Sequence, residues 1–206
     1  MTTPKGYAFY EHLLLLSPDH KINAEIMEIK TAYSNDYGLA SAPKSKPHIT
    51  LANFGQFESM EKPIVEGFEK LAKTIPPTTI KLSGFGQFNY RTIYINVMKN
   101  KPITHGVSAM KLRLAKKMNA IDTYKPSFIS NLHLTIARNI AEPQFKQAWE
   151  EWGKRRYSAS FAVNGMLLMK REIDPVTFKP KESYRLIKYF QFTGKEAEAE
   201  QLNLFK

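Results

Sequence analysis

The sequence predicts an α+β fold in which one arrangement of helices and antiparallel strands occurs twice. Apolar residues recur at helical spacing in several segments, and other segments have the aromatic and β-branched content of strands. In each half of the chain the expected order is a helix, a strand, a second helix and a pair of strands. The strand between the two helices carries nearly the same five residues in both halves, since residues 48–52 and 133–137 both read His, aliphatic, Thr, aliphatic, Ala. The repeated order and the repeated motif together indicate a duplication.

The first half begins with a strand and a helix. Residues 7–16 are rich in aromatic and aliphatic side chains and end at a Ser-Pro-Asp sequence that is typical of a helix start. Isoleucines at helical spacing then predict a helix over residues 18–31. The polar residues 33–47 contain glycine and proline, which predicts a loop leading to the first motif strand. Loops beside a cleft often hold substrate contacts.

A second helix and a strand pair follow the first motif. The helix is expected to begin at Glu58 and to end before Pro76, with its apolar residues on one face. The strands are expected over residues 79–88 and 92–97. Residues 84–86 read Gly-Phe-Gly without the further glycine and the lysine of a phosphate-binding loop, so they predict a strand bulge.

The second half repeats this order. An amphipathic helix ends near residue 118, a polar break follows, and the second motif lies in a strand over residues 128–138. A fourth helix precedes a strand pair, a further strand closes the sheet, and the tail from Gly194 is expected to be weakly ordered or helical. The expected helices span residues 107–118 and 143–154, and the expected strands span residues 158–163, 166–170 and 184–192.

The doubled motif has a chemistry that suits a phosphate group. In an extended strand His48 and Thr50 point to the same side, about 6.6 Å apart along the backbone, while their aliphatic neighbours point into a core. A histidine with a pKa near 6.5 can accept or donate a proton near neutrality, and a stiff threonine hydroxyl can donate to a phosphoryl oxygen. Chance repetition and ordinary half-buried strands are the alternative explanations, and the matched aliphatic and alanine residues disfavour both.

These motifs resemble those of a known family. The His-x-Thr triplets 85 positions apart, Pro47 before the first histidine and the run over residues 131–138 resemble the 2H phosphoesterase superfamily, in its 2′-5′ RNA ligase-like and cyclic phosphodiesterase branch. The resemblance implies a bilobal fold of pseudo-twofold duplicated antiparallel-sheet lobes, with helices on the outside and a central cleft lined by both motifs. Residues 1–206 would form a single domain of two intertwined lobes. The implied activity is cofactor-free, metal-independent hydrolysis of cyclic phosphodiesters at RNA or nucleotide ends.

In this interpretation the four motif side chains are the catalytic residues. One histidine, taken as His48, removes a proton from water, and His133 protonates the leaving ribose oxygen. Thr50 and Thr135 hydrogen-bond the non-bridging phosphate oxygens as charge builds on them. The sequence leaves open which histidine is the base, and reversal of the same proton transfers would give a weak 2′-5′ RNA ligase activity.

Further residues are candidates for binding the substrate. In a regular strand Arg138 faces away from Thr135, so a bend is needed to bring its guanidinium to the cleft; Asn53 stands at the equivalent place of the first motif. Aromatic residues near the motifs can stack on bases, with a place in the core as the alternative. The candidate stacking residues are Tyr33, Tyr37, Phe54, Tyr124 and Phe128. The remaining histidines, expected to be packing or surface residues, are His12, His20 and His105.

Composition limits the class of protein. The chain has 30 Lys and Arg against 19 Asp and Glu, and this net charge of +11 favours a polyanionic partner such as an RNA end or a cyclic nucleotide. The absence of cysteine excludes disulfides, thiol nucleophiles and Cys-type metal sites. Without a long apolar stretch or a secretory signal, the chain is expected to be a cytoplasmic monomer that does not enter membranes.

Two other classes of function remain open. The same basic cleft can bind a nucleotide or an RNA end without turning it over. A zinc hydrolase using several histidines is the third class, although two histidines and two threonines without nearby carboxylates make a poor metal set. Activity retained in EDTA would exclude the zinc enzyme.

Overall fold

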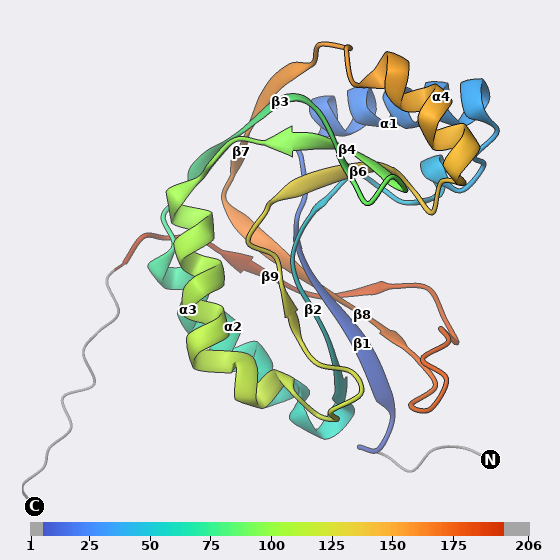
Figure 1. Cartoon of the computed structure of the whole chain (residues 1–206). Coiled ribbons are helices and arrows are strands. Elements are labelled where there is room, and N and C mark those ends of the chain that lie inside the picture. The colour runs from blue at the N-terminus through green and yellow to red at the C-terminus, as the bar shows by residue number, and fades with distance from the viewer. Residues whose placement is uncertain (1–5, 196–206) are drawn as a thin grey trace, which may run out of the picture.

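The computed structural model describes residues 6–195, which form a strongly curved sheet with helices on its outer faces (Figure 1). The part of the predicted tail beyond Lys195 lies outside the described residues. In chain order the elements are β1 (Phe9–Leu16), α1 (His20–Tyr37), the 3₁₀ helix η1 (Ala42–Lys44), β2 (Ile49–Phe57), the 3₁₀ helix η2 (Glu58–Met60), α2 (Glu61–Thr74), β3 (Thr78–Phe88), β4 (Thr92–Val97), α3 (Lys101–Met118), β5 (Ser127–Phe128), β6 (His133–Arg138), α4 (Glu142–Trp152), β7 (Ser158–Val163), β8 (Gly165–Glu172) and β9 (Arg185–Gln191).

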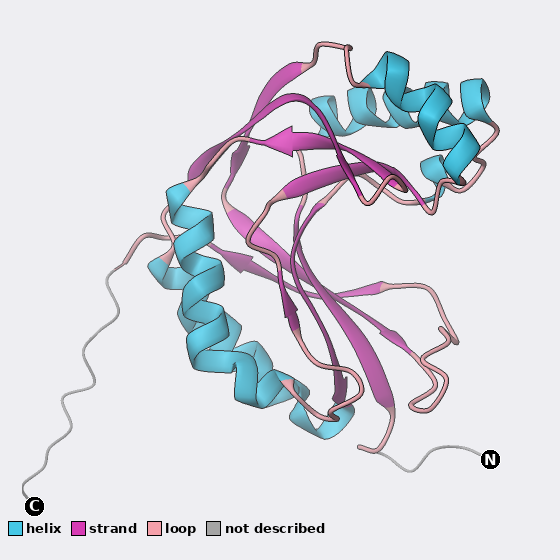
Figure 2. Ribbon diagram, viewed as in Figure 1, coloured by secondary structure: helices cyan, strands magenta, loops and turns pink. Residues whose placement is uncertain are grey.

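One antiparallel sheet joins the two halves of the molecule. Its strand order is β7-β3-β4-β6-β2-β1-β8-β9, with the short β5 also paired to β2. We call β7, β3, β4 and β6 with helices α1 and α4 the β6 lobe, and β2, β1, β8 and β9 with helices α2 and α3 the β2 lobe. Figure 2 shows the helices of each lobe on its outer side, so that the uncovered faces of the two half-sheets look toward each other. The predicted α+β fold of two duplicated lobes is confirmed.

The two lobes are intertwined through their helices. Helix α1 follows β1 of the β2 lobe but packs against β6, and α3 follows β4 of the β6 lobe but packs against β2. Each motif strand is therefore reached by the chain only after a helix has crossed to the other lobe. This exchange places the two motif strands, β6 and β2, side by side at the centre of the sheet.

Helix α1 is longer than the sequence indicated. It begins where the Asp19 carboxylate accepts a hydrogen bond from the backbone N–H of Ile22 at 2.9 Å, a capping contact that satisfies an otherwise unpaired donor. It continues past the predicted end at residue 31 because Tyr33 extends the buried face by another turn. The helix ends at Gly38, whose φ of 67° suits glycine. The predicted loop over residues 33–47 is correspondingly shorter.

The second motif strand is also shorter than expected. The chain forms β5 and β6 in place of one strand over residues 128–138, and both short strands pair with β2. Ala52 pairs with Phe128, and Ile49 pairs with Leu134. Leu134 therefore comes six residues after Phe128 in the chain, whereas Ala52 comes only three residues after Ile49. The additional residues form an irregular segment immediately before His133.

Helix α3 begins at Lys101, six residues before its expected start, because the Asn100 side chain caps it by accepting from the Ile103 N–H. Most other boundaries agree with the sequence to within a few residues. The expected bulge at Gly84 is present, since the pairing of β3 with β4 shifts between Leu82 and Phe85 and Gly84 has a φ of 64°. The hydrophobic core is a continuous cluster that draws side chains from both lobes, and each fully buried aliphatic or aromatic side chain stabilises the fold by about 1.5–3 kcal/mol. No helix in residues 6–195 is apolar over a length sufficient to cross a membrane.

Candidate active site

The two motifs meet across the central strand pair. β2 and β6 are antiparallel, and Ile49 faces Leu134. In an antiparallel pair the residues next to Ile49 face the residues next to Leu134, so each histidine lies opposite the threonine of the other motif. Facing Cβ atoms in such a pair are about 5 Å apart and diagonal neighbours about 7–8 Å, so the two imidazoles come within reach of one small anion. The facing pairs are His48 with Thr135 and His133 with Thr50.

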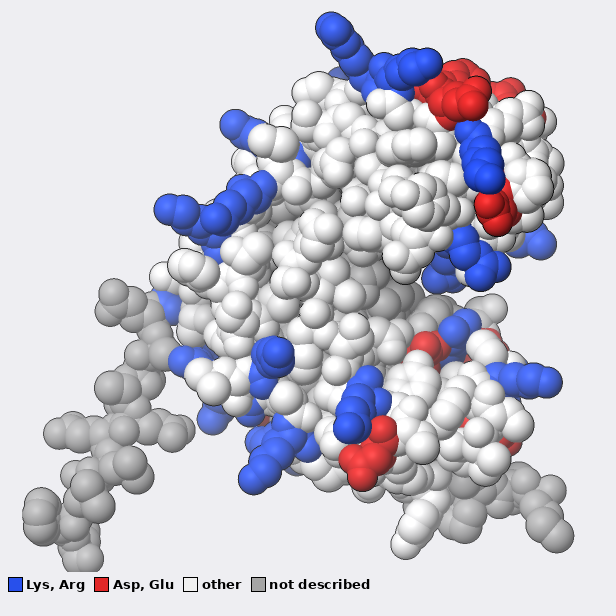
Figure 3. Space-filling model, viewed as in Figure 1, with Lys and Arg blue, Asp and Glu red and all other residues white. Residues whose placement is uncertain are grey.

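All four side chains lie on the uncovered face of the sheet. They are partly exposed, whereas their aliphatic neighbours Ile49, Leu51, Leu134 and Ile136 are buried. Figure 3 shows the surface hollowed between the two lobes on the right of the view, with Lys and Arg side chains on the upper rim. The predicted convergence of both motifs on one face therefore follows from the register of the central strands.

Both imidazoles are held in the same way. The Nδ1 atom of His48 lies 2.7 Å from the carbonyl oxygen of Lys46, and the Nδ1 atom of His133 lies 2.9 Å from that of Asn131. A carbonyl oxygen only accepts hydrogen bonds, so Nδ1 carries the hydrogen in each ring. In the neutral form of each histidine Nε2 then has a free lone pair. The two halves thus present equivalent nitrogens for proton transfer.

The surroundings of His48 favour its neutral form. Burial lowers the pKa of His48, and the positive charges of Lys30, Arg138 and His133 lower it further. The hydrogen bond to the Lys46 carbonyl opposes this shift without cancelling it. A histidine with a lowered pKa is unprotonated at neutral pH and can act as a base.

His133 lies against two aromatic rings. The Phe88 ring meets its edge at a centroid distance of 4.8 Å, and the Tyr94 ring lies 5.1 Å away. These two rings are stacked on each other at 4.2 Å. Gly86 makes room for them, because a Cβ atom there would come within 2.6 Å of the Tyr94 ring. This aromatic wall was not predicted from the sequence, although the alternation within β4 and the glycine opposite Tyr94 are signals for it.

A bulge in β6 brings Arg138 to the same face. Thr135 pairs with Tyr94 and Ala137 with Ile93, which leaves Ile136 as an extra residue. The side-chain alternation therefore changes, and Arg138, which pairs with Thr92, shares a face with Thr135. The bend that the sequence required is present at this position. The charge of Arg138 acts on both His48 and Lys30, so its guanidinium lies near the first motif as well.

The first motif contains the same bulge. Leu15 pairs with Thr50 and Leu14 with Ala52, so Leu51 is the extra residue and Asn53 shares the face of Thr50. The Asn53 side chain donates from Nδ2 to Glu11 at 3.2 Å and accepts from the Tyr124 hydroxyl at 3.3 Å. The two lobes therefore differ at one pair of equivalent positions, with an arginine in the β6 lobe and an amide in the β2 lobe.

Glu11 organises the wall of the β2 lobe. Its carboxylate accepts hydrogen bonds from Tyr124, from Tyr184 at 2.7 Å and from Arg171. Burial works to raise the pKa of Glu11, but the hydrogen bonds from these groups and from Asn53 outweigh burial and lower it. The carboxylate is thus ionised and paired, which leaves this wall close to neutral in charge.

The structure corrects the predicted stacking residues. Tyr33 and Phe54 are fully buried, Tyr33 against Trp152 with ring centroids 5.2 Å apart and Phe54 stacked on His12 at 4.7 Å. Neither ring has a free face for a base, so these two predictions were wrong because the aromatic residues fill the core. Phe128 pairs with Ala52 on the buried side and packs against the same core.

The remaining predicted residues fall in three different places. Tyr124 lies in the wall organised by Glu11, to which its hydroxyl donates a hydrogen bond. Tyr37 packs against the edge of the core, and its hydroxyl donates a hydrogen bond to the Glu151 carboxylate. His12 is a buried packing residue, while His20 and His105 are exposed at other positions. Within residues 6–195 no three His, Asp or Glu side chains are grouped as a metal ion would require.

Comparison with known proteins identifies the family. The sequence matches the model of the 2′-5′ RNA ligase superfamily over residues 18–175. The chain belongs to this superfamily. The resemblance to 2H phosphoesterases, based on the two motifs, is thereby confirmed. A search of curated proteins found no significant match.

Solved structures share the fold of this superfamily member. E. coli LigT in its apo form has a TM-score of 0.63 at 17% sequence identity, and the match covers 90% of this chain and 99% of LigT. TT0787 of Thermus thermophilus has a TM-score of 0.58 at 18% identity, with coverage of 90% and 99%. E. coli LigT complexed with 3′-AMP has a TM-score of 0.60 at 17% identity, again with coverage of 90% and 99%.

Proposed function

We propose that this protein hydrolyses 2′,3′-cyclic phosphates, or related cyclic phosphodiesters, at the ends of RNA or on nucleotides. The observation that carries the proposal is that two equivalent imidazoles, each fixed through Nδ1, face the threonine of the other motif across one strand pair. Membership of the 2′-5′ RNA ligase superfamily supports a phosphoesterase role in RNA processing. The similarity to a LigT structure complexed with 3′-AMP supports a nucleotide ligand.

The proposed mechanism uses the motif side chains alone. His48 Nε2 removes a proton from water as the water oxygen attacks phosphorus, and the bond from phosphorus to one ribose oxygen breaks. His133 donates a proton to that leaving oxygen. Thr50 and Thr135 donate hydrogen bonds to the non-bridging oxygens, where negative charge increases in the transition state. No step requires a metal ion or a cofactor.

The charges around the motifs support this assignment of roles. The lowered pKa of His48 supplies an unprotonated base, and Arg138 adds a positive charge on the face where the phosphate would lie. The net charge of +11 would attract an anionic substrate before it enters the cleft. With the 5′-hydroxyl of a second RNA end in place of water, the same proton transfers form a new bond from that oxygen to phosphorus as the bond to the 3′ oxygen breaks, which is a weak 2′-5′ RNA ligase activity.

The test is a hydrolysis assay without metal ions. An oligoribonucleotide ending in a 2′,3′-cyclic phosphate is incubated with the protein in EDTA, and the terminal monophosphate is detected by mass spectrometry. We expect turnover by the wild type and a loss of about 10²-fold or more in His48→Ala and in His133→Ala. His105→Ala is the matched control, because His105 is exposed on α3 in the β2 lobe, and it should retain full activity.

Other outcomes would point to other functions. Binding of the oligonucleotide without product, unchanged in both motif variants, would contradict the proposal and favour a module that binds RNA ends or nucleotides. Activity that disappears in EDTA and returns with zinc would contradict the metal-independent mechanism.

A further inference from the structure

A lysine is buried beside the first motif. The side chain of Lys30 is only 1% exposed, and it lies on the face of α1 that also buries Ile22, Ile26 and Tyr33. No carboxylate within residues 6–195 lies at ion-pair distance from its ammonium group. Lysine side chains are almost never fully buried without a charged partner, so this position requires an explanation.

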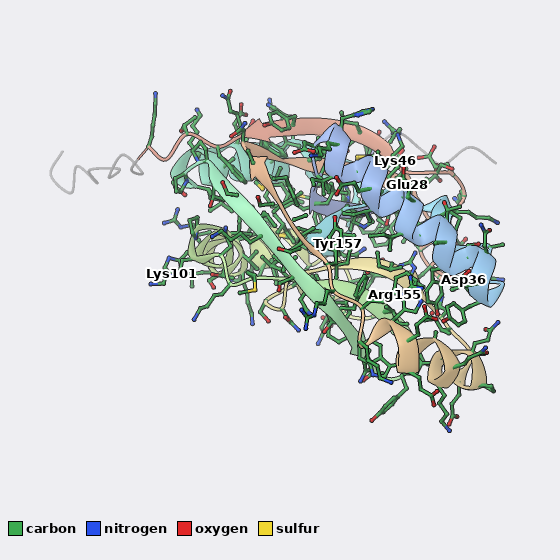
Figure 4. All side chains as sticks on the ribbon, turned by 90° about the horizontal axis from the view of Figure 1, so that it is seen from above. Glu28, Asp36, Lys46, Lys101, Arg155 and Tyr157 are labelled. Atoms are coloured by element: carbon green, nitrogen blue, oxygen red, sulfur yellow. The ribbon has the colours of Figure 1, made fainter. Side chains whose placement is uncertain are left out.

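The ammonium group is bonded to the segment that leads to His48. Lys30 Nζ donates to the Ser45 carbonyl at 2.6 Å and to the Ser45 hydroxyl at 2.9 Å. The carbonyl of the next residue, Lys46, is the acceptor that orients the His48 ring. Helix α1 contacts η1 just before this segment, and Figure 4 shows Lys46 beside α1. Lys30 therefore holds the peptide unit immediately before the one whose carbonyl orients the imidazole.

The second motif lacks this arrangement. Among the described residues no lysine or arginine side chain donates to the irregular segment before His133, and His133 packs instead against the Phe88 and Tyr94 rings. The two histidines thus have equivalent backbone contacts but different neighbours. The pseudo-twofold symmetry of the motifs is broken by a buried cation on one side and by aromatic rings on the other.

We propose that Lys30 is a positioning residue that assigns the role of base to His48. This inference rests on the proposed function, because it concerns the direction of proton transfer within the same cleft. The charged groups that act on His48 are Lys30 from α1 and Arg138 and His133 from β6, and all three disfavour a proton on its ring. Of these three residues Lys30 alone is buried, and its hydrogen bonds to Ser45 hold its ammonium group in place.

The experiment measures the titration of His48 directly. Imidazole resonances are followed by NMR against pH in the wild type, in Lys30→Met and in Lys30→Gln, with the His48 signals assigned by their loss in His48→Ala. Methionine removes the charge at similar size, and glutamine keeps a donor for the Ser45 carbonyl without the charge. Lys44→Met is the matched control, because Lys44 is exposed on η1 close to the same segment.

We expect the pKa of His48 to rise in both Lys30 variants and to stay unchanged in Lys44→Met. In the hydrolysis assay the acidic limb of the kcat/KM profile should move to higher pH in both Lys30 variants. Lys30→Met should in addition lose about 10- to 100-fold in kcat, because the His48 ring is no longer held in place. A loss of activity without a change in the acidic limb would indicate a merely structural role and would overturn the inference.

The titration and the assay can fail separately. If the wild type hydrolyses the cyclic phosphate while His48 titrates identically in the wild type and both Lys30 variants, the inference about Lys30 is wrong and the proposed function stands. If the wild type hydrolyses no cyclic phosphate while the His48 pKa rises in both variants, the proposed function is wrong and the coupling of Lys30 to His48 is supported.

Discussion

Replacing Lys30 with methionine should change how the stability of the protein depends on alkaline pH. Burial, together with the charge of Arg138, lowers the pKa of Lys30 from its ordinary value of 10.5 to about 8. Because one pH unit corresponds to 1.36 kcal/mol, this lowered pKa costs the folded state about 3 kcal/mol at pH 7, where Lys30 is charged, and about 1 kcal/mol at pH 10, where folding keeps it neutral. The methionine variant has no such cost at either pH.

The sign of the effect follows from linkage. The pKa of Lys30 is lower in the folded chain than in the unfolded chain, so the wild type gains stability as the pH rises from about 8 to 10.5. Loss of the donor to the Ser45 carbonyl costs the variant about 1–3 kcal/mol at any pH in this range. We therefore expect the stability of Lys30→Met relative to the wild type to fall by about 2 kcal/mol between pH 7 and pH 10.

Urea denaturation followed by tryptophan fluorescence at both pH values measures this difference. The protein contains two tryptophans and no cysteine, so alkaline pH introduces no thiol chemistry. Other lysines and the tyrosines titrate alike in both proteins, and the comparison isolates Lys30. A difference in the free energy of unfolding that stays constant from pH 7 to pH 10 would refute the assignment of a buried, charged lysine.

Other substitutions test the scaffold of the site. Gly86→Ala should lower activity and the melting temperature, because the new Cβ would come within 2.6 Å of the Tyr94 ring; an active variant of unchanged stability would contradict the described packing against His133. Glu11→Gln should cost about 2 kcal/mol in urea denaturation, since it leaves Arg171 without its carboxylate, and an unchanged midpoint would show that this network contributes nothing. Asp19→Ala should cost about 1 kcal/mol through loss of the α1 cap, and equal thermal unfolding of the two proteins would contradict that role. Between pH 6.5 and 5 the free energy of unfolding should fall, because the buried His12 has a lowered pKa and is protonated first in the unfolded chain. A His12→Phe variant should lose part of this pH dependence of stability. A plot of its free energy of unfolding against pH with the wild-type slope would contradict this prediction.

The architecture was predictable because its signals are periodic. Helical spacing of apolar residues, strand content and a repeated pentapeptide are local patterns, and the antiparallel pairing of the two motif strands follows once the chain is duplicated. That His48 and Thr50 lie on the same face could be predicted from the two-residue alternation of side chains along a strand alone. The family resemblance added the two lobes and the cleft.

Other parts of the site depend on contacts that no local pattern shows. Arg138 reaches the motif face only through the bulge at Ile136, and a single inserted residue in the pairing leaves no clear trace in the sequence. Lys30 continues the buried stripe of α1, where a lysine is ordinarily taken for the edge of the apolar face. Tyr33 and Phe54 were misassigned because an aromatic residue near a motif has the same sequence signature in a core and in a binding wall.

The pH dependence of kcat/KM for a 2′,3′-cyclic phosphate substrate tests the central claim most directly. We predict a bell-shaped profile for the wild type, with an acidic limb set by His48 below its ordinary pKa of 6.5, and loss of that limb in the residual activity of His48→Ala. His133→Ala should lose about 10²-fold or more in kcat/KM, because the leaving oxygen no longer receives a proton. Bell-shaped profiles at near wild-type rates in both single variants would contradict a mechanism based on these two histidines.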